Sequence, residues 1–184
     1  MFTYCPKCAS KNITLHEGKV FRCPDCDLTY YQNTAAATGC LIIVPDHDGE
    51  KFVFLIRGKE PGLGKLDIPG GFVDVGEGVI EGLYRELQEE IGWAPNIPAG
   101  VKLTDVFTLY ASFPNVYDYK GIKYNTCDIY FFVRAPGLKP EDLQLEEAEI
   151  ADVLFLKPEE IDFSSFAFPS TLNAVNAYLK MFNK

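Results

Sequence analysis

Three glutamates in one short stretch of the chain are spaced for metal chemistry. Glu86, Glu89 and Glu90 lie within a segment whose apolar residues recur at helical spacing. At about 100° per residue, Glu89 and Glu90 fall roughly 60° and 40° to either side of Glu86, so the three carboxylates share one narrow helix face. Like charges at this spacing repel each other. Mg²⁺ or Mn²⁺ would offset the repulsion by binding carboxylate oxygens, waters and substrate phosphates, so the pattern predicts a divalent-metal site for phosphate chemistry.

Glycines accompany this acidic helix. Gly78 and Gly82 precede Glu86 by eight and four residues and therefore lie on its side of the predicted helix. A glycine inside a helix costs about 1 kcal/mol relative to alanine. The loop at residues 58–71, directly before the helix, is also rich in glycine. Both features indicate that a ligand or another backbone segment approaches the carboxylates closely, which an acidic helix facing only water would not require.

The same residues carry a family resemblance. Gly71, Glu77 and the run Arg85-Glu86-Leu87-Gln88-Glu89-Glu90-Ile91-Gly92 meet every fixed position of the Nudix hydrolase signature, G-x5-E-x7-R-E-U-x-E-E-x-G-U. The single departure is Trp93 at the last aliphatic position. The resemblance implies a pyrophosphohydrolase that depends on Mg²⁺ or Mn²⁺. The metal ligands that it implies are Glu86, Glu89, Glu90 and the backbone carbonyl around Gly71.

The resemblance also implies roles for residues around the metal. The general base is either Glu89 or a glutamate on a later loop, for which Glu149 is our candidate. Glu149 could instead be a further metal ligand. Glu77 and Arg85 lie eight residues apart, and in the family they fix the catalytic helix and its loop.

The N-terminal cysteines predict a second metal site. They form two C-x2-C pairs with fourteen residues between them: Cys5, Cys8, Cys23 and Cys26. Two such turns can present four thiolates to one Zn²⁺, and the intervening segment is long enough for a hairpin. Two disulfides are the alternative, which a reducing compartment disfavours. We therefore predict a zinc ribbon over residues 1–34, stabilised mainly by its metal because so short a piece buries little core.

Composition narrows the class of protein. The 184 residues carry a formal net charge of −9, which argues against non-specific binding to nucleic acid. Bound cations would reconcile that charge with a phosphate-bearing substrate. No apolar run approaches the length of a membrane span, and the first residues lack a signal pattern. We expect a cytoplasmic protein that acts on a small nucleotide, with neither membrane nor nucleic acid as a partner.

Hydrophobic patterning predicts an α/β fold. Strands are expected over residues 35–44, 51–57, 66–68 and 150–156 and within the longer segments 101–113 and 122–134. A helix is expected to start at 157–161, and another over 170–182. The family resemblance implies an α/β/α sandwich with a mixed sheet over residues 35–184, preceded by the zinc ribbon.

The substrate is less closely defined. A zinc ribbon followed by a Nudix domain resembles the branch that includes NADH pyrophosphatase and ADP-ribose pyrophosphatase. That branch carries S-Q-P-W-P-F-P-x-S, of which this chain retains only Phe113-Pro114. NADH, NAD and ADP-ribose therefore stay open as substrates, each cleaved at its pyrophosphate to release a nucleoside monophosphate.

Aromatic residues around the connecting segment 114–121 predict a site for the nucleobase, since aromatic faces stack on bases. The candidates for substrate binding are Phe113, Asn115, Tyr117 and Tyr119. A homodimer is a further expectation from the resemblance. The alternative function is a Nudix-like sensor that binds a nucleotide without cleaving it and uses the ribbon as a partner-binding arm.

Overall fold

The computed structural model describes residues 2–182. By their internal contacts, these residues form two compact units, divided between Thr34 and Ala35. No helix in the described part of the chain is long and apolar enough to cross a membrane.

The N-terminal unit is a three-stranded antiparallel sheet with very little core. Its strands, in spatial order, are β1 (Thr14–His16), β2 (Val20–Cys23) and β3 (Leu28–Tyr31). Among the described residues its buried apolar cluster consists of Cys5, Phe21 and Cys23, with Ile13, Cys26 and Leu28 packed against it. Since two of the three buried residues are cysteines, the packing of this unit depends on what those thiols bind.

The second unit is built on a seven-stranded mixed sheet. Its main path runs β10-β5-β4-β9-β8, while β6 pairs with β5 and β7 pairs with β4. The β4–β9 pairing is parallel and the others are antiparallel. The strands are β4 (Ala35–Asp46), β5 (Gly49–Arg57), β6 (Leu66–Asp67), β7 (Gly70–Phe72), β8 (Thr108–Tyr119), β9 (Ile122–Arg134) and β10 (Ile150–Leu156).

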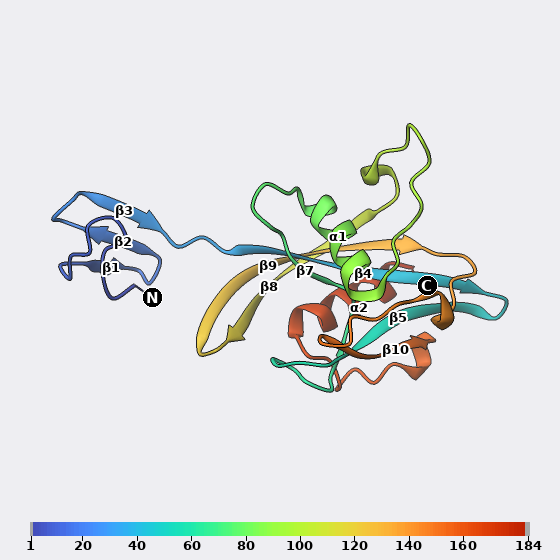
Figure 1. Ribbon diagram of the computed structural model, residues 1–184. Helices are drawn as coiled ribbons and strands as arrows, with labels where there is room; N and C mark the ends of the chain where they lie inside the picture. The colour runs from blue at the N-terminus through green and yellow to red at the C-terminus, as the bar shows by residue number, and fades with distance from the viewer. Residues whose placement is uncertain (1, 183–184) are drawn as a thin grey trace. The chain divides into compact units, whose positions relative to one another are not determined.

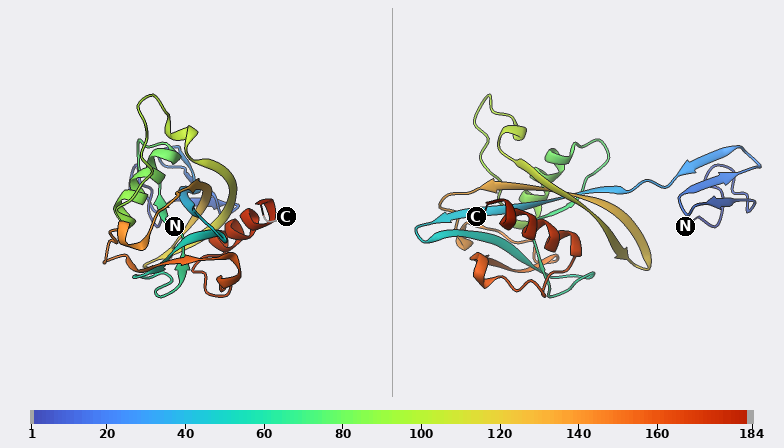
Figure 2. Two further views of the ribbon diagram at one scale, coloured as in Figure 1. Left: turned by 90° about the vertical axis from the view of Figure 1, so that its right-hand side faces the viewer. Right: turned by 180° about the vertical axis from the view of Figure 1, so that it is seen from behind.

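Two helices cover the opposite faces of this sheet, as Figure 1 and the left view of Figure 2 show. They are α1 (Val79–Ile91) and α2 (Pro169–Phe182). Alternate residues of β4 point to opposite faces. Ile42 packs in the cluster that contains Leu87 of α1, while Ile43 packs in the cluster that contains Val175 of α2. Because β4 is buried on both faces, its sequence is a continuous apolar run. The expected α/β/α sandwich is confirmed.

The segment after Phe113 differs from the sequence-based expectation. Residues 114–119, expected to be a loop, continue strand β8, and the register with β9 runs to the pair Tyr119 and Ile122. The turn is therefore Lys120-Gly121, both with positive φ, as in the tight turns that suit a twisted hairpin. Pro114 predicted the end of a strand, because proline lacks the N–H that pairs with a neighbour. However, β8 is an edge strand, where a missing N–H can be tolerated.

Short 3₁₀ turns account for the other differences. The β-rich segment expected over 101–113 begins with η1 (Leu103–Asp105), and its strand starts only at Thr108. The helix expected at 157–161 is the single turn η3 (Pro158–Glu160). A third such turn is η2 (Pro140–Asp142). Proline at the first position of η2 and η3 favours a helical start, but neither turn carries the apolar stripe that would extend it along the core.

Candidate active site

The backbone of β7 lies directly against the carboxylate face of α1. The N–H of Gly70 donates a hydrogen bond to Oε2 of Glu90 at 2.8 Å. A Cβ added at Gly70 would lie 2.1 Å from the carbonyl oxygen of Thr38, and one at Gly71 would lie 2.5 Å from Oε1 of Glu86. A side chain at Gly70 would collide with the backbone of β4, and one at Gly71 would have to displace the carboxylate of Glu86. The two glycines thus let the main chain approach the helix, as the glycine-rich pattern predicted.

Arg85 ties the preceding loop to the same helix. Its Nε donates to Oε1 of Glu77 at 2.8 Å, and its Nη2 donates to the carbonyl of Phe72 at 3.0 Å. Its Nη1 donates to Oε1 of Glu86 at 2.9 Å and to Oε2 of Glu89 at 2.8 Å. These hydrogen bonds lower the pKa of Glu77 and raise that of Arg85. Arg85 and Glu77 thus position the loop and the carboxylates and do not themselves line the adjacent cavity.

The three glutamates differ strongly in exposure. Glu90 is 9% exposed, and the pKa of its carboxyl rises to about 8 because of burial, with a smaller contribution from the charge of Glu86. Burial also raises the pKa of Glu86, against the effect of Arg85. The side chain of Glu89 is 59% exposed. A bound divalent cation would stabilise the ionised form of buried carboxylates as close together as those of Glu86 and Glu90, since the ion supplies the opposite charge.

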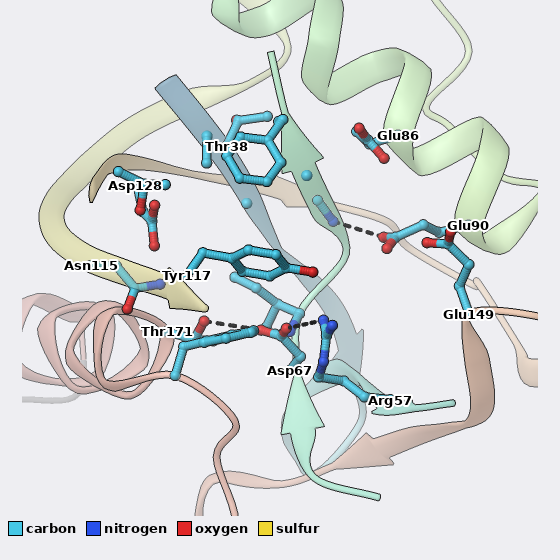
Figure 3. Close-up of a pocket in the computed structure, with 18 of the residues that line it drawn as sticks. Thr38, Arg57, Asp67, Glu86, Glu90, Asn115, Tyr117, Asp128, Glu149 and Thr171 are labelled. Atoms are coloured by element: carbon cyan, nitrogen blue, oxygen red, sulfur yellow. Dashed lines mark hydrogen bonds and ion pairs between the residues drawn. The ribbon is translucent and has the colours of Figure 1, made fainter. Parts of the chain in front are cut away.

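A cavity of about 630 Å³ runs from these carboxylates toward β8 and β9. Figure 3 shows Glu86, Glu90 and Glu149 at one end, Asn115 and Asp128 at the other, and the ring of Tyr117 between them. Glu89 and Gly71 also line the cavity. The predicted metal ligands and the candidate base Glu149 therefore face one cavity, which is open to solvent and large enough for a nucleotide.

Of the four predicted substrate-binding residues, two line the cavity and two do not. Asn115 and Tyr117 line the cavity. The ring of Phe113 packs against Tyr130 in the core, with their centroids 6.4 Å apart. Tyr119 is 45% exposed and stacks on Tyr117 outside the cavity, with a centroid distance of 6.5 Å. All four are every second residue of β8 and therefore lie on the same face of the strand, but the cavity covers only the middle of that face.

Several cavity residues were not identified from the sequence. Phe168, just before α2, packs its ring 5.8 Å from that of Tyr117, and the guanidinium of Arg57 lies 5.0 Å from the centroid of Phe168. Arg57 also forms an ion pair with Asp67 at 3.0 Å. Lys59 is paired with Glu149. No local pattern marks these residues, because they come from segments that are distant in sequence.

The cysteines of the N-terminal unit form a second candidate metal centre. The ligand atoms of Cys5, Cys8, Cys23 and Cys26 all lie within 4.8 Å of one another. The Sγ atoms of Cys5 and Cys26 are 3.6 Å apart, as are those of Cys8 and Cys23. A disulfide bond is about 2.05 Å long, whereas four sulfurs around a metal at about 2.3 Å would be about 3.8 Å apart. The cluster fits a tetrahedral metal site and not a pair of disulfides.

Comparison with known proteins identifies the second unit. The family model for the NUDIX domain matches residues 33–175, which include the loop, the helix and the cavity described above. The chain belongs to the Nudix hydrolase family. The enzyme class expected from the signature is thereby confirmed, and Nudix enzymes use a divalent metal, which agrees with the carboxylates on α1.

Two individual Nudix proteins are similar to this chain. The chain is 27% identical over 89 residues to the NAD-capped RNA hydrolase NudC of Vibrio atlanticus (strain LGP32), covering 48% of this chain and 31% of that protein. The match thus spans about a third of the relative's length. A crystal structure of a NUDIX hydrolase from Nitrosomonas europaea is 25% identical, with a TM-score of 0.65 over 98% of this chain and 92% of the other.

A further solved structure, at lower identity, shares the fold. It is the NUDIX domain of Shewanella oneidensis NrtR in complex with ADP ribose, which is 15% identical with a TM-score of 0.64. The alignment covers 86% of this chain and 92% of that one.

Proposed function

We propose that this protein hydrolyses the pyrophosphate bond of an adenine-containing nucleoside diphosphate, with ADP-ribose and NADH as the first candidates, and releases AMP. The observation that carries the proposal is a single cavity with carboxylates at one end and aromatic side chains farther along it. The comparisons support it, because the NrtR domain was crystallised with ADP ribose and the Vibrio relative is named for NAD-capped RNA. Both ligands contain an adenosine joined through a pyrophosphate.

The metal end of the cavity is assigned to Mg²⁺ or Mn²⁺. The residues that would hold the ion are Glu86, Glu89, Glu90 and the carbonyl of Gly71. When bound, such an ion neutralises phosphate oxygens and lowers the pKa of a water ligand. Arg85 holds Glu86 and Glu89 in place through its two Nη1 hydrogen bonds, so the ligands are positioned before substrate arrives.

We assign the general base to Glu149. Its carboxylate lines the cavity and is paired with Lys59, whose side chain is 42% exposed and can move to a substrate phosphate. That movement would leave an oxygen of Glu149 to accept the proton of the attacking water, a contribution of roughly 10²–10⁴ in rate. Glu89, the alternative base, is held by Arg85, which is itself committed to several fixed partners.

We assign the nucleobase to the aromatic part of the cavity. Tyr117 and Phe168 supply ring surface there, and the guanidinium of Arg57 packs on the ring of Phe168. Each ring that stacks on a base contributes roughly 1–3 kcal/mol. Asn115, which also lines the cavity, can form hydrogen bonds with a polar edge of the ligand.

Product analysis tests this function. The protein is incubated with Mg²⁺ or Mn²⁺ and separately with ADP-ribose, NADH, NAD and ATP, and the products are separated by liquid chromatography and weighed by mass spectrometry. We expect AMP from the diphosphate-linked substrates, with ¹⁸O from labelled water in one of the two products. Glu149→Gln should lower kcat by at least about 10²-fold. Glu147→Gln, at an exposed position outside the cavity, is the matched control.

The outcomes separate hydrolysis from the alternative role as a sensor. Binding of ADP-ribose without any product, in wild-type protein saturated with metal, would support a nucleotide sensor and reject the hydrolase proposal. A preference for ATP over every diphosphate-linked substrate would reject the substrate assignment while keeping the Nudix chemistry.

The N-terminal unit is assigned one structural Zn²⁺. Four thiolates within reach of one ion and a very small apolar core support this assignment. A homodimer remains a prediction, which light scattering on the purified protein would check.

A further inference from the structure

Asp128 of β9 lies at the end of the cavity away from the metal carboxylates (Figure 3). It is 7% exposed. Its Oδ2 accepts a hydrogen bond from the hydroxyl of Ser170 at 2.6 Å, and the hydroxyl of Tyr130 lies 3.5 Å away. Its Oδ1 is buried and has no hydrogen-bond partner among the described residues. A buried acceptor without a partner is costly, so this oxygen is a candidate for ligand contact.

The surroundings of Asp128 hold the carboxylate in place and leave space in front of it. Ser170 is in the first turn of α2, a position where the helix dipole favours a negative charge. Asp128 pairs in the sheet with Ala37 of β4, whose small side chain lies on the same face and also lines the cavity. Thr126, two residues before Asp128 and on the same face, has a buried hydroxyl without a partner in the described structure. The pair forms a polar patch at the cavity wall.

The order of groups along the cavity indicates what reaches this patch. In a nucleoside diphosphate bound with its phosphates at Glu86 and Glu90, the ribose lies next and the base lies farthest from the metal. The ring of Tyr117 stands between the two ends, where a base can stack on it. The part of the ligand that meets Asp128 is therefore the edge of the base. A carboxylate accepts hydrogen bonds and donates none, so it favours an amino group over a carbonyl.

We propose that Asp128 determines base specificity by accepting a hydrogen bond from the exocyclic amino group of adenine. The inference rests on the proposed function in that the ligand is a nucleotide, but it does not require hydrolysis. Hypoxanthine has an oxygen in place of that amino group and would put two acceptors face to face. A site built around a polar contact rejects an analogue that lacks it, because the buried group is left unpaired.

Binding of AMP and IMP tests the proposal without turnover. Calorimetry in the presence of Mg²⁺ should give wild-type protein a preference for AMP of at least about tenfold, the scale of one hydrogen bond to a charged group. In Asp128→Asn the side-chain amide can donate to the hypoxanthine oxygen, so the preference should fall to about twofold or reverse. Asp118→Asn removes the same charge from an exposed position on β8 outside the cavity and should keep the wild-type preference.

Each outcome decides one of the two proposals. Equal binding of AMP and IMP by wild-type protein, binding of neither, or an unchanged preference in Asp128→Asn would overturn the role of Asp128. A preference for AMP that depends on Asp128, in a protein that does not hydrolyse ADP-ribose, would keep this inference and reject the proposed reaction. Since Ser170 can still donate to the amide oxygen, Asp128→Asn should fold, and its melting temperature checks this.

Discussion

Replacing Glu90 by glutamine should make the metal-free protein more stable at neutral and alkaline pH. Burial raises the pKa of this carboxyl from 4.5 to about 8. Between those two values the native protein retains a proton that the unfolded chain releases, so the stability of the wild type falls as pH rises through the window. Below about pH 4.5 both states are protonated, and the penalty disappears. Glu90→Gln removes the titration.

The size of the effect follows from the same shift. One pKa unit corresponds to about 1.4 kcal/mol, so a shift from 4.5 to about 8 sets an upper limit of about 4 kcal/mol for the destabilisation at pH 8. The glutamine side chain has nearly the same volume, and its oxygen can accept the hydrogen bond from the N–H of Gly70. The free energy of unfolding of Glu90→Gln should therefore exceed that of the wild type at pH 8, by up to about 4 kcal/mol, and match it near pH 4.5.

Urea denaturation at several pH values measures this difference. Trp93, the single tryptophan of the chain, packs against the core beside α1, so its fluorescence follows the unfolding of the Nudix unit. Buffers are freed of Mg²⁺ and Mn²⁺ without chelators strong enough to remove zinc. Glu89→Gln is the control, because the side chain of Glu89 is 59% exposed and its replacement relieves little burial. Its effect should be small, about 0.5 kcal/mol, and without the steep pH dependence.

The activity of the same variants completes the test. Glu90→Gln should lower kcat by at least about 10²-fold at saturating Mg²⁺, since the glutamine lacks the charge that would bind the ion. Added Mg²⁺ should stabilise the wild type more than the variant. A stability gain that is equal at pH 5 and pH 8 would refute the burial argument. Near wild-type turnover would show that this carboxylate face is not the metal site.

Three further predictions address the core, the cavity and the ribbon. Changing Leu87, a fully buried residue on the core side of α1, to alanine should lower the free energy of unfolding by about 2–5 kcal/mol. A loss below about 1 kcal/mol in urea titrations would contradict its core position. Tyr117→Ala should raise the KM for ADP-ribose by about tenfold with a smaller effect on kcat. Tyr119→Ala, at a position outside the cavity, should leave both constants nearly unchanged. A larger increase in KM for Tyr119→Ala than for Tyr117→Ala in steady-state kinetics would place the base elsewhere. Metal analysis of protein purified without added metal should find one equivalent of zinc, reduced in Cys8→Ser; a full equivalent in that variant would exclude Cys8 as a ligand.

The sequence alone determined the parts of this protein that depend on short-range spacing. The carboxylates of α1 are three and four residues apart, so helical geometry places them together whatever the rest of the chain does. The two C-x2-C pairs likewise define a thiol cluster through two short turns and a hairpin. The buried strand β4 was visible as an apolar run, because a strand covered on both faces has no polar alternation.

The tertiary structure decided the rest of the cavity, because its contacts join residues that are far apart in the chain. Whether Tyr117 is in a loop or a strand depended on its pairing with β9. The contacts of Asp128 with Ser170 and of Asp67 with Thr171 span 42 and 104 residues, and no local periodicity encodes such distances. The same sheet geometry directs Phe113 into the core and Tyr117 into the cavity, although both lie on one face of the strand. Their positions depend on where α2 and the residue before it, Phe168, pack over that face, which only the packing of the folded chain determines.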